Sequence, residues 1–402
     1  MNIRTLMLGT VLACGTSFGA QAADAIALGN VVALDICDSL GLSGLTIGSN
    51  DTCLRISGLV KYEFLWGNYE NTRYADNFRD QAINFFNPHP DDFNSRSTID
   101  WRLRFEAVTD SEFGPARAWL QLDEDGNDDL QFTQAYVQIG DQTVLSAGLK
   151  GTIFDTGDSR VHNNFLGLFG TMATGGPVTG PSNSHVIQIS STVAEGVVVS
   201  AGLEGLNSDN PFAVGVVELS GGWGAGHLSV ASNEDGEWKL HTAGQFSFDA
   251  FDLTTAVAAD HTGFWNALVS GQLELDLFTI SGGVQYAEGG AFDQQWGAGA
   301  QISADVTDTV TINLGSRYLT NTDTAEEIWQ VALGADVDIT DNLVLDARIG
   351  YVNSTYVTAG PDFAYGDVEL QYRPGGGVLA VLGAEVNTTG AWRGNFSLEK
   401  TF

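Results

Sequence analysis

Residues 54–66 read LRISGLVKYEFLW, and their side chains alternate between two kinds. The even-numbered positions carry apolar residues or glycine, whereas Arg55, Ser57, Lys61 and Glu63 occupy odd-numbered positions. Successive side chains of a β-strand point to opposite faces of the sheet. The stretch therefore predicts a strand with one apolar face and one polar face.

The same alternation recurs to the end of the chain. In Thr98–Thr109 the apolar residues are odd-numbered, and in Trp238–Phe248 they are even-numbered. Three further segments repeat the pattern: Trp265–Leu275, Phe278–Tyr286 and Val310–Tyr318. Counting segments by this rule gives about 20 candidate strands, and no long segment shows the 3.6-residue period of a helix.

Three features favour a membrane barrel over a β-sandwich. Segments of about 9–12 residues match a tilted strand that crosses a membrane. Aromatic residues lie near segment ends, where interfacial girdles need them: Trp66, Trp238, Tyr286, Tyr318, Tyr351 and Tyr372. The third feature is the alternation of connection lengths along the chain.

Short connections lie at 221–223, 275–277 and 373–376, and long ones at 67–96, 151–184 and 352–362. Membrane barrels have short periplasmic turns and longer external loops. Within lipid every backbone polar group must be paired, so the sheet must close. The sequence therefore predicts an all-β fold, a closed antiparallel transmembrane β-barrel.

The N-terminus has the features of a secretory signal peptide. Arg4 supplies a positive charge, an apolar stretch follows, and Ala20 and Ala22 form a small-x-small cleavage site. We expect a signal peptide over 1–22, a lead-in over 23–53 and a barrel over 54–402. Acylation at Cys14 after lipoprotein cleavage is the alternative, although Leu12 suits that site poorly.

The formal net charge of −33 excludes several classes of function. Nucleic-acid binding needs a basic surface, and adsorption on anionic lipid needs one too. After 1–22 no apolar run reaches the roughly 18 residues of a membrane helix.

Cys37 and Cys53 are the cysteines that remain after removal of 1–22. In an exported protein, two cysteines close in sequence predict a disulfide. Two free thiols are the alternative, and two cysteines without nearby histidine make a poor metal site.

Several segments resemble a known family. They are CDSLG at 37–41, TCLRISGLVKY at 52–62, WRLRFE at 101–106, AYVQI at 135–139 and the terminal FSLEKTF at 396–402. These segments resemble the alphaproteobacterial porins of the rhizobial and Brucella type. The resemblance implies a 16-stranded, trimeric, general diffusion channel of the bacterial outer membrane. We expect an even strand number from 16 to 20, with 16 favoured by this resemblance.

In general porins the third external loop folds into the barrel and narrows it. Here that loop spans about 151–184 and contains Asp155, Asp158 and Arg160. Its apolar run at 165–169 needs a surface to pack against, which the barrel interior would supply. An external flap or a contact between subunits is the alternative.

Opposite such a loop, porins carry a basic wall. Arg102 and Arg104 share the polar face of one strand, and Arg117 lies on the next. Rings of charge set ion selectivity, so these arginines are candidate pore residues. Alternatively, they only pair with Glu106 and Asp100 on the wall.

The run at 123–129, DEDGNDD, resembles half of a calcium loop, with Asp123, Asp125 and Asn127 as weak candidate ligands. It lacks the bidentate Glu of an EF-hand, so a solvated acidic hairpin tip is the simpler interpretation. A divalent ion there would bridge to lipopolysaccharide. The sequence predicts no cofactor and no other metal site.

Catalytic motifs are absent from suitable contexts. A barrel hydrolase would need a Ser and a His together on the lipid-facing side, and His185 and Ser191 lie six residues apart. A sugar-specific channel would need a ladder of lumenal aromatics, for which Trp119 and Trp329 are candidates. We therefore expect no enzyme, but a trimeric channel for small hydrophilic solutes and ions, weakly cation-selective because acidic residues dominate.

Overall fold

The computed structural model of the chain describes residues 46–48, 52–68, 95–124, 130–154, 178–180, 184–290, 292–323, 325–355, 362–388 and 390–402. Every regular element in these ranges is a β-strand. No helix in this part of the chain is long and apolar enough to span a membrane. The predicted signal peptide and most of the lead-in lie outside the described residues.

The strands form one antiparallel sheet. They are β1 (Thr46–Gly48), β2 (Thr52–Asn68), β3 (Ser95–Thr109), β4 (Ala116–Glu124), β5 (Gln131–Gly140), β6 (Thr143–Lys150), β7 (Ser184–Ala194), β8 (Val197–Glu204), β9 (Phe212–Gly221), β10 (Gly224–Ser232), β11 (Trp238–Phe248), β12 (Phe251–Asp260), β13 (Trp265–Leu275), β14 (Phe278–Gly289), β15 (Phe292–Thr307), β16 (Val310–Asn321), β17 (Glu326–Thr340), β18 (Leu343–Ser354), β19 (Phe363–Gly375), β20 (Val378–Asn387) and β21 (Trp392–Thr401).

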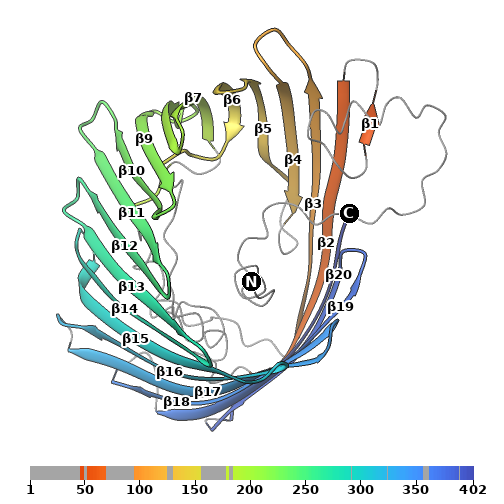
Figure 1. The fold of residues 1–402 in the computed structure, drawn as a ribbon, viewed down its shortest axis with the longest axis vertical. Helices are drawn as coiled ribbons and strands as arrows, with labels where there is room; N and C mark the ends of the chain where they lie inside the picture. The colour runs from red at the N-terminus through yellow and green to blue at the C-terminus, as the bar shows by residue number, and fades with distance from the viewer. Residues whose placement is uncertain are drawn as a thin grey trace.

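The sheet closes between its first long strand and its last strand. From β2 to β21 each strand pairs with its neighbour in sequence. β2 also pairs with β21, from Leu59 opposite Thr401 to Asn68 opposite Trp392. The short β1 pairs with the beginning of β2, beyond the end of β21. The wall is therefore a closed ring of strands, β2 to β21 (Figure 1).

The barrel has 20 strands, so the strand number favoured by the family resemblance, 16, is wrong. The upper end of the expected range, which came from counting alternating segments, is confirmed. The resemblance covered mainly 37–155 and the last strand, and it carried no information on the hairpins between them. Each alternating segment became a wall strand because a closed sheet in lipid leaves no other place for such a segment.

The faces of the barrel are inverted relative to a soluble protein. Trp238, on the apolar face of β11, is 46% exposed, whereas His241 on the polar face is 1% exposed. The apolar face predicted for Thr98–Thr109 likewise faces outward, with Ile99 47% exposed. The polar faces line the lumen, as expected for a barrel whose outer surface contacts hydrocarbon.

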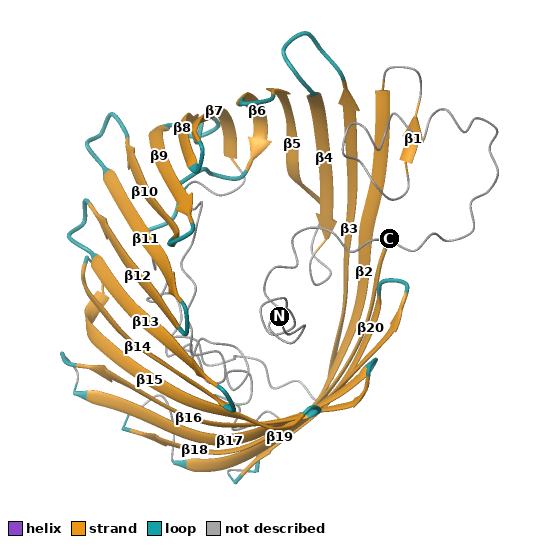
Figure 2. Ribbon diagram, in the orientation of Figure 1, coloured by secondary structure: helices purple, strands orange, loops and turns teal. Residues whose placement is uncertain are grey.

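Because the strands alternate in direction, the short turns lie at one end of the barrel and the longer described connections at the other; Figure 2 draws the described turns and loops in teal. Two-residue turns at 222–223, 249–250 and 276–277 are typical of the short end. The C-terminus lies at this end too, because the amide of Thr401 donates to the carbonyl of Gly377, 2.8 Å away. We therefore take the short end as periplasmic.

The wall differs in height around the ring. Strands β5 to β10 contain between 8 and 11 residues, whereas β14 to β19 contain between 12 and 16. The 151–183 connection joins β6 and β7, which belong to the part of the wall with the shorter strands.

Candidate functional site

Four arginines line the lumen on β2, β3 and β4. We call Arg55, Arg102, Arg104 and Arg117 the basic wall. Glu106 lies between two of them: its carboxylate accepts from Arg55 at 2.5 Å and from Arg117 at 2.9 Å. Register pairing puts Glu106 directly opposite Arg55, so neighbouring strands bring these charges together.

The other two arginines have different partners. Arg102 donates from Nε to Asp123 at 2.7 Å, and its own side chain is 46% exposed. Arg104 donates to the amide oxygen of Gln121 at 2.9 Å and 2.6 Å. The guanidinium of Arg104 is therefore hydrogen-bonded to a neutral amide and not to a carboxylate, so its positive charge still acts on the lumen.

A line of stacked side chains continues from the basic wall toward β6. The guanidinium of Arg104 lies 4.8 Å from the centroid of the Trp119 ring. Trp119 stacks on Tyr136 with centroids 6.1 Å apart, and the ammonium of Lys150 lies 5.4 Å from the Tyr136 centroid. Cation–π contacts hold each charge in place while the lumen keeps access to it.

Acidic residues gather on the part of the wall formed by β17, β18 and β19. We call Asp336, Asp346 and Glu369 the acidic row, because they are direct cross-strand partners. Asn313 donates to Asp336 at 2.6 Å, and Gln371 donates to Glu369 at 2.8 Å. Neutral donors thus hold two of these carboxylates, and the row keeps a negative charge on the lumen wall.

Both described ends of the 151–183 connection are buried inside the barrel. Ile153 and Phe154 at its start and Val178 at its end belong to one apolar cluster. The rest of that cluster lies on or beside the lumenal face of β9 to β14, and its members are Val214, Val216, Ala231, Ala258, Phe264 and Ala287. The two ends of the connection therefore converge against the same inner surface.

Hydrogen bonds fix these two ends as well. The buried carboxylate of Glu204 accepts from the backbone amide of Ile153 at 2.9 Å and from the hydroxyl of Thr152. Gln188 donates to Glu204 at 2.8 Å and to the carbonyl of Gly151 at 2.9 Å. At the other end, Lys239 donates to the carbonyl of Thr179 at 2.5 Å. The polar contacts and the apolar cluster together direct the connection into the lumen.

Two solved structures are similar to this chain, both with TM-scores below 0.5. A mutant of the Rh. blastica porin is 13% identical, covering 87% of this chain and all of that chain with a TM-score of 0.40. OmpT of Vibrio cholerae is 14% identical, covering 88% of this chain and all of that chain with a TM-score of 0.43.

Among curated proteins, Porin Omp2a of Brucella ovis is 28% identical over 250 residues, covering 56% of this chain and 68% of the relative. Porin Omp2a of Brucella melitensis is also 28% identical, and the chain spans slightly less than two thirds of its length, 65%. The porin subfamily pattern matches residues 32–367, which is most of the chain. This chain belongs to the porin subfamily. Its place is the bacterial outer membrane, and the alphaproteobacterial resemblance is confirmed.

Some of the predicted pore residues lie within the described part of the chain, and the others lie outside it. Arg102, Arg104 and Arg117 all face the lumen of the porin and lie close together. Arg102 forms an ion pair with Asp123, and Arg117 forms one with Glu106, as the alternative expected for Glu106. Asp155, Asp158 and Arg160 lie outside the described residues, as does the apolar run at 165–169.

The cysteine prediction is also only partly in view. Cys53 is fully buried at the beginning of β2 and is disulfide-bonded. Cys37 lies outside the described residues, so its pairing with Cys53 stays a prediction.

The weak calcium candidate is partly visible. Asp123 accepts from Arg102 and also from Gln121 at 2.7 Å and from Thr133, so its oxygens are engaged within the porin. Asp125 and Asn127 lie outside the described residues. Over the described ranges, no group of three or more His, Cys, Asp or Glu side chains is placed to hold a metal ion.

The alternatives weighed from the sequence gain little support. Trp119 faces the lumen, but Trp329 lies on the outer face. There its ring packs against that of Tyr351, with centroids 5.5 Å apart. A lumenal ladder from these two residues is therefore excluded. Ser191 contacts the hydroxyl of Thr143 at 2.7 Å, and no contact with His185 brings the two together.

Sequence reasoning missed the residues that hold the two described ends of the 151–183 connection inside the lumen. We call these ends, Ile153-Phe154 and Val178, the roots of the connection. Glu204 and Lys239 are ordinary polar-face residues of alternating strands. Phe154 was not distinguished from the many other apolar residues near strand ends. A signal was present in Ile153-Phe154, an apolar pair that begins three residues after the end of β6, where a solvated loop would begin.

Proposed function

We propose that this porin is a passive, water-filled channel through which small hydrophilic solutes and ions diffuse, with a weak preference for cations. The observation that carries the proposal is a closed barrel whose polar face lines the lumen and into which both described ends of the 151–183 connection are directed. A wall of hydrogen-bonded strands separates lipid from water. The channel needs no catalysis and no cofactor.

The 151–183 connection is the constriction loop of the proposed channel. Its described ends are held inside the barrel by Phe154, Val178 and Glu204. Asp155, Asp158 and Arg160 follow directly after the first root, so we place them at the narrow part, where they would face the basic wall. Facing charges of opposite sign create a field across the passage that orients solutes.

Replacing 155–177 with a short Gly-Ser linker tests this role. Both roots stay in place, and they belong to one cluster, so a short linker can join them. Single-channel recordings in planar bilayers should then show a larger conductance. An unchanged conductance would place the loop outside the conduction path. Recordings without discrete steps from the unaltered protein would overturn the channel itself.

Selectivity follows from the balance of two parts of the lumen. The acidic row and the overall excess of acidic residues favour cations, whereas the basic wall opposes them. Charges are screened over about 8–10 Å in physiological salt, so selectivity should be weak and should increase in dilute salt.

The reversal potential in a KCl gradient measures this balance. Replacing Arg102 and Arg104 with Gln should push the pore further toward cations. Lys400→Gln is the control, because Lys400 is exposed on the lipid-facing side of β21 at its periplasmic end, opposite the outward-facing Val60. Anion preference in the unaltered protein at low salt would refute cation selectivity.

We also propose that the porin assembles as a trimer, on the basis of its resemblance to general porins. Native mass spectrometry of the detergent-extracted protein tests it. A mass of three chains is the expected result, and a mass of one chain would contradict it.

We also expect the external acidic loops to contact lipopolysaccharide through divalent ions. Chelation of those ions should weaken the contact.

A further inference from the structure

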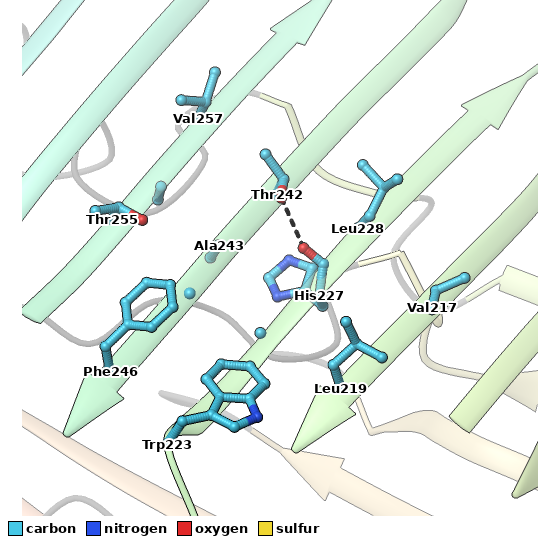
Figure 3. Close-up of a pocket in the computed structure, with 13 residues that line it drawn as sticks. Val217, Leu219, Trp223, His227, Leu228, Thr242, Ala243, Phe246, Thr255 and Val257 are labelled. Atoms are coloured by element: carbon cyan, nitrogen blue, oxygen red, sulfur yellow. Dashed lines mark hydrogen bonds between the residues drawn. The ribbon is translucent and has the colours of Figure 1, made fainter. Parts of the chain in front are cut away.

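A groove runs along the outer surface of the barrel on β9 to β12. Its volume is about 480 Å³. Trp223 and Phe246 lie at its periplasmic end, and Leu228 lies further along the wall (Figure 3). Val217 and Val257 form its two sides. Trp223, Val217, Leu228 and Val257 are exposed on the lipid-facing side. Phe246 is partly buried and shares the outward face of β11 with the exposed Trp238 and Phe248.

The floor of the groove exists because two glycines lie side by side. Gly226 on β10 is the direct cross-strand partner of Gly244 on β11. Neither carries a side chain to fill the surface, and the neighbouring side chains rise around them. A Cβ added at Gly244 would lie 2.9 Å from the Cε2 atom of Phe246, so the aromatic ring folds over that glycine. The groove thus extends across β9 to β12, from Val217 to Val257.

The chemistry of the groove is apolar. None of its described lining residues is Asp, Glu, Lys or Arg. The hydroxyl of Thr242 already donates to the carbonyl of His227, 2.8 Å away (Figure 3). An ordered water needs two to four polar partners, and the groove offers few. It lies within the outer wall of the barrel, where hydrocarbon is the surrounding medium.

We propose that this groove binds one acyl chain of a phospholipid from the periplasmic leaflet. The chain runs along β10 and β11 between Val217 and Val257, and the ring of Phe246, packed over Gly244, forms part of the surface that it contacts. Trp223 and Phe246, whose ring centroids are 5.7 Å apart, mark the level of the interface, where aromatic side chains sit next to headgroups. The headgroup lies beside the turn at 222–223, and the acyl chain points toward the membrane midplane.

The gain comes from close packing rather than from the hydrophobic effect. Lipid hydrocarbon is as apolar as the groove, so removal from water contributes nothing. A groove that follows a single chain provides dispersion contacts on three sides, which a disordered neighbouring lipid lacks. The bound chain therefore exchanges more slowly than the other lipids around the barrel. This inference is independent of what the lumen conducts.

Photo-crosslinking tests the proposal. The full-length protein is placed in vesicles of phosphatidylethanolamine of which a fraction carries a diazirine in one acyl chain. Labelling should concentrate on peptides from β10 and β11. Thr255→Phe and, separately, Val217→Phe place a ring into the groove from its opposite sides and should reduce that labelling about tenfold, equivalent to about 1.4 kcal/mol.

Ser316→Phe is the matched control, because Ser316 is exposed on the lipid-facing side of β16, outside the groove. It should leave labelling of β10 and β11 unchanged. Heat-modifiability on gels confirms that each variant is folded. Labelling spread evenly around the barrel, or equal in Thr255→Phe and the control, would overturn the proposal. A changed number of subunits in the two filling variants would also overturn it, because a second copy of the chain would then occupy the groove.

Discussion

Glu106 decides how two of the lumenal arginines act. Its buried carboxylate binds both Arg55 and Arg117, so one negative charge offsets two positive ones. Glu106→Gln should release that offset and shift the reversal potential toward anions, because two guanidiniums then face the lumen without a carboxylate. Glu112→Gln is the control, since Glu112 is exposed in a periplasmic turn. An equal shift in both variants would mean that only net charge matters.

Cys53 is the second residue whose chemistry can be tested alone. We expect Cys37 and Cys53 to be oxidised to each other in protein taken from the outer membrane. The bridge would close a loop of about 15 residues and stabilise the fold by about 3 kcal/mol in the chain-entropy model. Intact mass after alkylation without reduction checks this prediction. Two alkylated thiols would refute it.

Among the elements, the root of the 151–183 connection depends most on one side chain. Phe154 is fully buried in the lumenal cluster, and its ring centroid lies 6.4 Å from that of His241. Replacing a buried Phe with Ala typically costs about 3–5 kcal/mol. Phe154→Ala should therefore loosen the loop and increase the current noise of the open channel. Phe113→Ala, at a side chain that is 76% exposed in a turn, should leave the recordings unchanged.

The pairing of β21 with β2 depends on a glycine. The backbone of Gly58 exchanges two hydrogen bonds with that of Phe402, at 2.8 Å and 3.0 Å. A Cβ at Gly58 would lie 2.4 Å from Cζ of Phe402 and 2.7 Å from the carbonyl of Arg102. Gly58→Ala should therefore displace the terminal ring and reduce the yield of closed barrel.

Gly366→Ala is the matched control, because a Cβ there would meet its nearest neighbours at 3.7 Å and 3.8 Å, an ordinary contact distance. The fraction of fast-migrating protein on unheated gels measures closure. Equal fractions for the two alanine variants would show that the terminal ring does not guide assembly.

The whole molecule should be heat-modifiable. In a closed barrel every strand is hydrogen-bonded on both sides, so no edge is available for SDS to begin unfolding. Unheated protein should migrate as a compact or oligomeric species, and boiling should shift it to the position of an extended chain. Identical mobility before and after boiling would contradict the closed sheet.

At this scale the net charge was readable from the composition, and the basic wall at Arg102, Arg104 and Arg117 was predicted from the strand faces, but the acidic row was not. The structure separates the basic wall on β2 to β4 from the acidic row on β17 to β19. Asp336, Asp346 and Glu369 are distant in sequence, and only strand register places them side by side. Selectivity therefore depends on position in the ring as much as on net charge.

The strands, their two faces and the class of protein could be predicted from the sequence, because period-2 alternation is a local property. The segments Trp238–Phe248 and Trp265–Leu275 agree with β11 and β13 to the residue. Tertiary structure alone decided which side chains meet across strands, as with Glu106 and Arg55, and where the roots of the 151–183 connection are held. It also decided closure: counting alternating segments predicted about 20 strands, but only the pairing of β2 with β21 shows that the ring closes after 20. Cross-strand register and closure are long-range properties, and alternation within one segment carries no information about its neighbour.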